Sequence, residues 1–196
     1  QSVEARLNEF RTARLARLNT GEGIRLSASG HAVLHVSPVA QGNAVLDVDV
    51  VAKNTQMFTP LGDSGHTTRF NFDGLLLTSG LSEGGRHGAY TQVFRDGRIE
   101  TASSGYVGER RERGLERVLF YGDLIPHLLK AIPRLVGGLH QHGWGPPYAV
   151  MVSLLDVRGS VMLSRDAFRD APRLDRDRLI FEPILLQDAG FESGWE

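Results

Sequence analysis

The stretch YTQVFRDGRIETAS, residues 90–103, predicts two β-strands that fold back on each other about Asp96-Gly97. An Asp-Gly pair between two alternating segments is typical of a two-residue type I′ turn. Such a hairpin joins antiparallel strands, so we expect a mainly antiparallel sheet around it.

The first strand of this hairpin carries an aromatic face formed by Tyr90, Gln92 and Phe94. We expect this face to pack against a long helix further along the chain, as one wall of the core. Acidic and basic residues balance on the hairpin, so a nucleic-acid-reading surface is the less favoured interpretation. Arg95 and Arg98, together with Tyr90, are the candidate residues for contact with a ligand or partner.

Segments rich in β-branched and apolar residues predict five further strand regions on either side of the hairpin. They cover 31–38, 43–52, 69–79 with a bend at Asp73-Gly74, 148–163 with a break at Arg158-Gly159, and 178–187. Pro183 in the last segment is typical of an edge strand or a bulge.

A first helix is predicted over 3–19, where apolar residues recur at near-helical spacing and Gly21 follows to end the helix. We interpret residues 1–20 as a linker or docking helix and 21–196 as a single domain, because 196 residues are enough for one sizeable core.

A second, longer apolar pattern predicts a helix over 115–142. Pro126 and Pro133 each remove a hydrogen bond, so we expect one kinked helix or two short ones. Strands on both sides of one long helix indicate an α+β fold, with that helix covering one face of the sheet.

Composition excludes some classes of protein. Hydrophobic residues make up 41% of the chain and charged residues 23%, and no apolar run approaches the roughly 20 residues that span a bilayer. The formal net charge is −1, so no global field attracts nucleic acid. The chain has no cysteine, which excludes disulfides and Cys-containing zinc sites and leads us to expect a cytoplasmic protein.

Asp47 and Asp49 are candidate catalytic residues. On the predicted strand 43–52 they share one side, about 7 Å apart, where two carboxylates can hold magnesium or serve acid–base chemistry. A metal-dependent nuclease or phosphodiesterase is therefore one hypothesis, and it requires a histidine or third acid nearby. The competing interpretation is the solvated face of an antiparallel strand.

His140 and His142, with His127, form the tightest histidine group and are the alternative metal ligands. Residues two apart on a helix point in different directions, and histidine is already favoured near a helix C-terminus. We therefore expect no metal and no other cofactor. Nucleophile and phosphate-loop motifs are absent, and two arginine-rich segments, 109–117 and 165–178, are interleaved with acids, as on a salt-bridged surface.

Several blocks of the sequence together resemble a known bacterial arrangement. They are RLNEFRTARLARLNTGE (6–22), RFNFDGLL (69–76), YTQVFRDGRIET (90–101), IPRLVGGLHQHGWGPPYAVMVSLLDVRG (132–159) and LDRDRLIFEPILLQD (174–188). In this order they are similar to the region that follows the Schlafen AlbA-like domain in bacterial proteins labelled DNA-binding or ATP-binding. The resemblance covers nearly the whole chain, and none of its blocks is a catalytic motif.

The resemblance implies that nucleic-acid handling belongs to an AlbA-like domain before Gln1, with which the first helix would connect. The chain begins at Gln1 inside a helical pattern, so we expect it to be part of a longer protein. The expected function is a non-enzymatic accessory domain that couples such a domain to a partner, a ligand or a second copy of itself. The alternatives are the metal-dependent enzyme and direct binding of nucleic acid.

Overall fold

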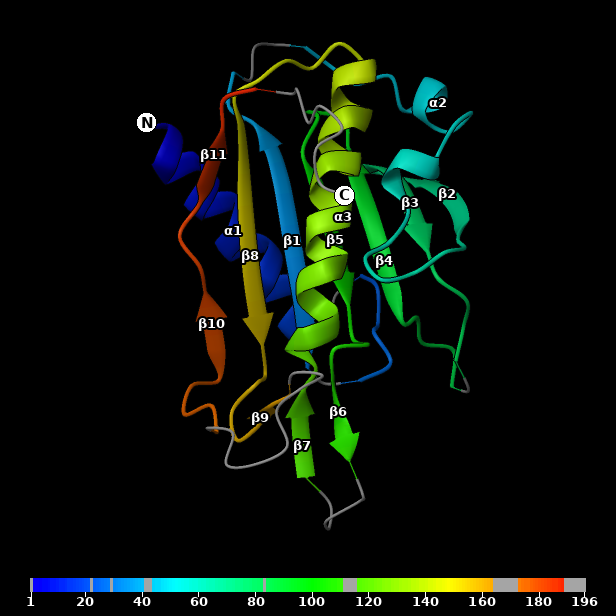
Figure 1. Ribbon diagram of the computed structural model, residues 1–196. Helices are drawn as coiled ribbons and strands as arrows, with labels where there is room; N and C mark the ends of the chain where they lie inside the picture. The colour runs from blue at the N-terminus through cyan, green and yellow to red at the C-terminus, as the bar shows by residue number, and fades with distance from the viewer. Residues whose placement is uncertain are drawn as a thin grey trace.

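The computed structural model describes residues 2–21, 23–28, 30–40, 44–82, 84–110, 116–163 and 173–188. An eight-stranded antiparallel sheet forms its centre, and one helix packs on each face of that sheet (Figure 1). The α+β class expected from the sequence is confirmed. No helix in the described ranges has the length and apolar character needed to cross a membrane.

The strands of the main sheet come from distant parts of the chain. They are β1 (His31–Pro38), β2 (Thr67–Asn71), β3 (Gly74–Thr78), β4 (Ala89–Phe94), β5 (Ile99–Ser103), β8 (Tyr148–Leu155), β10 (Arg178–Ile180) and β11 (Ile184–Leu186). Their order is β10-β8-β1-β5-β4-β3-β2, and β11 pairs with β8. A smaller sheet joins β6 (Val107–Arg110), β7 (Glu116–Leu119) and β9 (Val161–Met162), with β7 and β9 parallel.

The helices are α1 (Val3–Thr20), α2 (Val48–Val51) and α3 (Tyr121–Gln141), with a short 3-10 helix η1 (Gln56–Phe58). The Ser2 side chain caps the first turn of α1, and Gly21 ends the helix in the left-handed conformation, φ 68°, as predicted. In Figure 1, α3 lies in front of the sheet and α1 behind it.

The two faces of the sheet differ in polarity. Under α3, alternate residues of five strands form one continuous apolar core with the helix; the sheet residues include Leu34, Val36, Leu75, Leu77, Val93, Ile99 and Val150. Under α1 the apolar contacts are divided into two small clusters. One surrounds Leu15 and the other surrounds Leu7 and Phe10.

The long helix differs from the prediction at its start. It begins at Tyr121 and runs unbroken through both Pro126 and Pro133. Its buried stripe keeps helical spacing, so packing outweighs the hydrogen bonds that the prolines remove. Residues 116–119, predicted as helix, form strand β7 because they pair with β6 and β9.

One predicted strand is wrong, and a second is divided into two strands. Residues 48–51 of the segment 43–52 form the helix α2, because Asp47 caps it by accepting hydrogen bonds from the N–H groups of Asp49 and Val50. The segment 69–79 is a hairpin rather than one bent strand. Asn71 pairs with Gly74, so Phe72 and Asp73 form a two-residue turn between β2 and β3.

The β4–β5 hairpin is confirmed, but its turn is not type I′. The N–H of Gly97 donates to the Phe94 carbonyl (3.1 Å), and Gly97 alone in the turn has a positive φ, 79°. This is a type I turn followed by a glycine bulge. The aromatic face also packs on the opposite side from the one predicted, since Tyr90 and Phe94 join the clusters under α1.

The segment 178–187 contains two short strands, β10 and β11, that flank Pro183. Both pair only with β8 and so lie at the edge of the sheet, as the proline predicts.

Candidate functional site

Four polar side chains meet between α1 and the sheet. The Glu100 carboxylate accepts hydrogen bonds from the Tyr90 hydroxyl (2.6 Å), from His35 Nε2 (2.9 Å), and from Nε and Nη2 of Arg14 (3.0 and 2.7 Å). We call this group the Glu100 network. The side chains of Glu100 and His35 are completely buried, and that of Arg14 is 14% exposed.

Electrostatics keep Glu100 charged. Burial on its own would raise the pKa of this carboxyl, because an ionised group loses its hydration. Hydrogen bonds and positive charge from His35 and Arg14 outweigh burial and lower the pKa of Glu100 to about 2. Burial and the charge on Glu100 raise the pKa of Tyr90, so its hydroxyl stays protonated and donates.

Strand register brings the network together. His35 of β1 lies directly opposite Glu100 of β5, and Gln92 of β4 lies opposite Glu100 on its other side. Tyr90 is two residues from Gln92 and therefore points to the same face. Arg14 reaches this face from α1.

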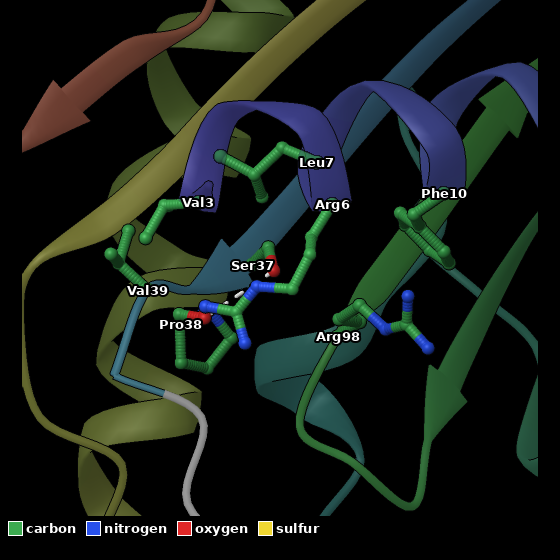
Figure 2. A pocket seen from close by; sticks show the side chains of 8 residues that line it. All are labelled: Val3, Arg6, Leu7, Phe10, Ser37, Pro38, Val39 and Arg98. Atoms are coloured by element: carbon green, nitrogen blue, oxygen red, sulfur yellow. Dashed lines mark hydrogen bonds between the residues drawn. The ribbon is translucent and has the colours of Figure 1, made fainter. Parts of the chain in front are cut away.

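A small hollow of about 20 Å³ lies under the N-terminal half of α1, with room for about one water molecule (Figure 2). Its lining residues are Val3, Arg6, Leu7, Phe10, Ser37, Pro38, Val39 and Arg98. Figure 2 shows the Arg98 side chain extending beneath Phe10. The guanidinium carbon lies 4.0 Å from the centroid of the Phe10 ring, and the same guanidinium is paired with Asp96.

A larger hollow of about 130 Å³ lies beside the C-terminal half of α1. Its lining residues are Arg14, Arg17, Leu18, Gly23, Ile24, Arg69, Asn71, Asp73, Leu76, Tyr90 and Gln92. Asp73 lies 3.9 Å from Arg14 Nη1 and 3.7 Å from Arg17 Nη1. Arg14 and Tyr90 belong to both this hollow and the Glu100 network.

The predicted contact residues are thus separated. Tyr90 lines the larger hollow and Arg98 the smaller one. Arg95 lines neither hollow: its side chain is exposed at the turn, and its backbone bonds to Asp73 and Leu46.

Asp47 and Asp49 do not form the expected carboxylate pair on a strand. Both are exposed, and Asp47 is occupied as the cap of α2. Within the described residues, no three histidine or acidic side chains gather closely enough to hold a metal ion. Asp47 and Asp49 therefore do not supply the paired carboxylates that the metal-dependent enzyme hypothesis requires.

The three histidines of the predicted group on and after α3 each have different surroundings. His140 is exposed on the last turn of α3, and His142 lies 6.1 Å from Phe58, ring centroid to ring centroid. Nδ1 of His127 shares a hydrogen bond with the Tyr106 hydroxyl (2.7 Å).

Of the arginine-rich segments, residues 111–115 and 164–172 lie outside the described residues. Among the described members, Arg117 pairs with Asp156 and Arg173 pairs with Glu116.

Sequence reasoning missed Glu100, His35 and Arg14 as one group. One signal was present in the hairpin: Glu100 is an acid that shares a face with the aromatic side chains of β4. Comparison with known proteins found no matching family model, no matching curated protein and no matching solved structure. The resemblance to the region after an AlbA-like domain stays a prediction.

Proposed function

We propose that this chain is a non-enzymatic accessory domain in which α1 separates from the sheet and docks on it again. We call this reversible docking the α1 joint. On one side α1 would connect to a nucleic-acid-handling domain of the AlbA-like type, and on the other it borders the larger of the two hollows, which would take a ligand or a side chain of a partner. The observation that carries this proposal is the Glu100 network, which divides the contacts of α1 into two small apolar clusters with a hollow beside each.

The polarity of the two faces favours α1 over α3 as the element that opens. Removing α3 would expose one continuous apolar core, which carries a large hydrophobic cost. Removing α1 would expose two small apolar clusters and a set of polar groups that water can solvate. We therefore expect α1 to separate from the sheet at a lower free energy than α3.

Both hollows depend on the position of α1. Residues of α1 form part of each lining, together with residues of the sheet and its loops. An occupant that touches α1 and the sheet together stabilises the docked helix. By linkage, a force that displaces the helix weakens binding of that occupant. This reciprocity is how an accessory domain of this shape would couple its neighbours.

Native-state hydrogen exchange tests the proposal. The amides of α1 should exchange through a partial opening, with a lower free energy than those of α3 and a weaker dependence on denaturant. Arg14→Ala should lower the opening free energy of α1 further than that of α3. Exchange of both helices at one common free energy, in the native chain and in the variant, would exclude a separate opening of α1.

Direct nucleic-acid binding is a second candidate, favoured by one observation. Phe72 at the β2–β3 turn is 98% exposed and Phe70 on the edge strand is 53% exposed, beside Arg69. Exposed aromatic rings next to arginine can stack on the bases of a single strand. Phe72→Ala should then reduce retention on a single-stranded DNA column at low salt, whereas Phe181→Ala, at the opposite edge, should not. No retention of the native chain would eliminate this candidate.

A further inference from the structure

We propose that a small anion, a phosphate-type oxyanion or a carboxylate, binds in a hollow between α3 and the loop before β2. The hollow has a volume of about 330 Å³ and is lined by Gly62, Asp63 and Ser64 of the loop and by His127, Lys130 and Arg134 of α3. Its lining contains no residue of α1, so this site is independent of the joint proposed above.

The guanidinium of Arg134 is the feature that most strongly indicates an anion-binding site. Its Nη2 donates to the Thr59 carbonyl (2.7 Å), but its Nε is buried and has no hydrogen-bond partner among the described residues. Among the described residues no carboxylate lies within ion-pair distance of it, and burial lowers its pKa without any acid to offset that effect. A partly buried guanidinium without a counter-charge is costly unless an anion compensates it.

Two further polar side chains of the lining lie on the same side of α3 as Arg134. His127, Lys130 and Arg134 are spaced by three and four residues, which places them on one face of the helix. Burial and the charge of Arg134 lower the pKa of His66 in the loop, and the charge of Asp63 acts in the opposite direction. The arginine fork and the lysine ammonium both suit an oxyanion.

The acid in the lining is directed elsewhere. Oδ1 of Asp63 accepts hydrogen bonds from the N–H groups of Ser64 (2.9 Å) and Gly65 (3.4 Å) in its own loop. None of the ion pairs within the described ranges joins Asp63 to Lys130 or Arg134. Among the described residues, Asp63 therefore forms no ion pair with either cation of the hollow.

The Tyr106 hydroxyl fixes the position of the His127 ring. Burial, with the charges of Asp123 and Asp63, raises the pKa of Tyr106, so its hydroxyl stays protonated and can donate to Nδ1 of His127. Gly62 permits this arrangement, because a Cβ there would lie 2.2 Å from the Tyr106 oxygen and the residue has φ 77°.

The size of the hollow fits a small ligand. Its volume is at the lower end of the roughly 300–1,000 Å³ of small-molecule sites. A phosphate or carboxylate group with a few further atoms fits this space, and the cations at its wall supply the recognition.

Isothermal titration of the full chain with inorganic phosphate and, separately, with acetate tests the site at constant ionic strength. We expect saturable binding of at least one of them, weakened about tenfold or more in Lys130→Ala. The matched control is Lys53→Ala, since Lys53 is the other lysine of the chain and is also exposed, and it should bind like the native chain. Arg134→Gln should abolish binding, and Arg134→Lys should restore part of it.

The two ions distinguish the source of the anionic group, and either one supports the site. The proposal is overturned if neither ion binds saturably, if both lysine variants bind equally, or if only a single-stranded oligonucleotide binds. Lys130→Ala should leave the hydrogen exchange of α1 unchanged, because Lys130 lines only the hollow beside α3, so failure of this site and failure of the α1 joint are separate outcomes.

Discussion

Glu100 is a charged carboxylate with no exposed surface, held by donors from α1, β1 and β4. Such a buried ionic group adds little net stability compared with a well-packed apolar one, but removal of one partner leaves an uncompensated charge. The network therefore fixes where α1 docks more than how tightly it docks. Loss of Glu100 would leave Arg14 and His35 without their hydrogen-bond acceptor.

Acid should weaken the fold through Glu100. Its pKa is about 2 in the folded chain against an ordinary 4.5, so its contribution is present above pH 4.5 and is lost as the pH falls toward 2. The difference corresponds to a contribution on the order of 3 kcal/mol. Urea unfolding at a series of pH values should show this loss in the native chain.

Glu100→Gln should lower the free energy of unfolding at pH 7 by about 3–5 kcal/mol, so that it unfolds at a lower urea concentration than the native chain. Between pH 4.5 and 2 its free energy of unfolding should then fall less than that of the native chain. The exposed Glu4→Gln on α1 serves as the control and should follow the native pH profile. Parallel pH profiles for the native chain and Glu100→Gln would contradict the assigned charge state.

At the scale of elements, two adjacent glycines of α3 should respond oppositely to alanine. A Cβ on Gly138 would lie 2.8 Å from Phe58 Cζ and 2.9 Å from Met57 Cβ, whereas one on Gly137 would meet only the flexible end of Met57, at 3.2 Å. Alanine is favoured over glycine inside a helix by about 1 kcal/mol. Gly137→Ala should therefore be neutral or stabilising, and Gly138→Ala destabilising by about 1–3 kcal/mol.

Thermal or urea unfolding of the two variants measures this difference. Equal effects of the two substitutions would mean that α3 does not pack on η1 as described.

Elements with strong local signals could be predicted from the sequence. The first helix has a periodic face and a terminal glycine, and the β4–β5 hairpin has an Asp-Gly turn. The segment 43–52 misled the prediction because its β-branched alternation matches a strand, while the Asp47 cap selects a helix. Residues 116–119 match a helix locally, but pairing with β9, more than forty positions away, makes them a strand.

At the scale of the whole molecule, the candidate site depends on contacts that no local pattern contains. Glu100 and His35 are 65 residues apart, and Glu100 and Arg14 are 86 apart. The order β8-β1-β5-β4 makes them neighbours, and sequence periodicity does not specify that order. The difference in polarity between the two faces of the sheet follows from the same pairing, and it is the basis of the proposed joint.

Thiol labelling tests the joint most directly, because the chain has no native cysteine. Ser153 and Thr91 are both completely buried, and within the part of the chain that the structure describes neither hydroxyl has a hydrogen-bond partner. Ser153 alternates with Met151 and Leu155 on the α1 face, whereas Thr91 shares the α3 face with Val93. Ser153→Cys and Thr91→Cys are therefore matched probes of the two faces.

The rate of labelling in native buffer, divided by the rate in the unfolded chain, gives the opening equilibrium at each position. If α1 docks reversibly, the opening equilibrium constant measured at Ser153→Cys should be at least about tenfold larger than that at Thr91→Cys. This corresponds to a difference of about 1.4 kcal/mol or more in the free energy of opening. Arg14→Ala should widen this difference. Equal protection of the two positions, at the free energy of global unfolding, would contradict the account.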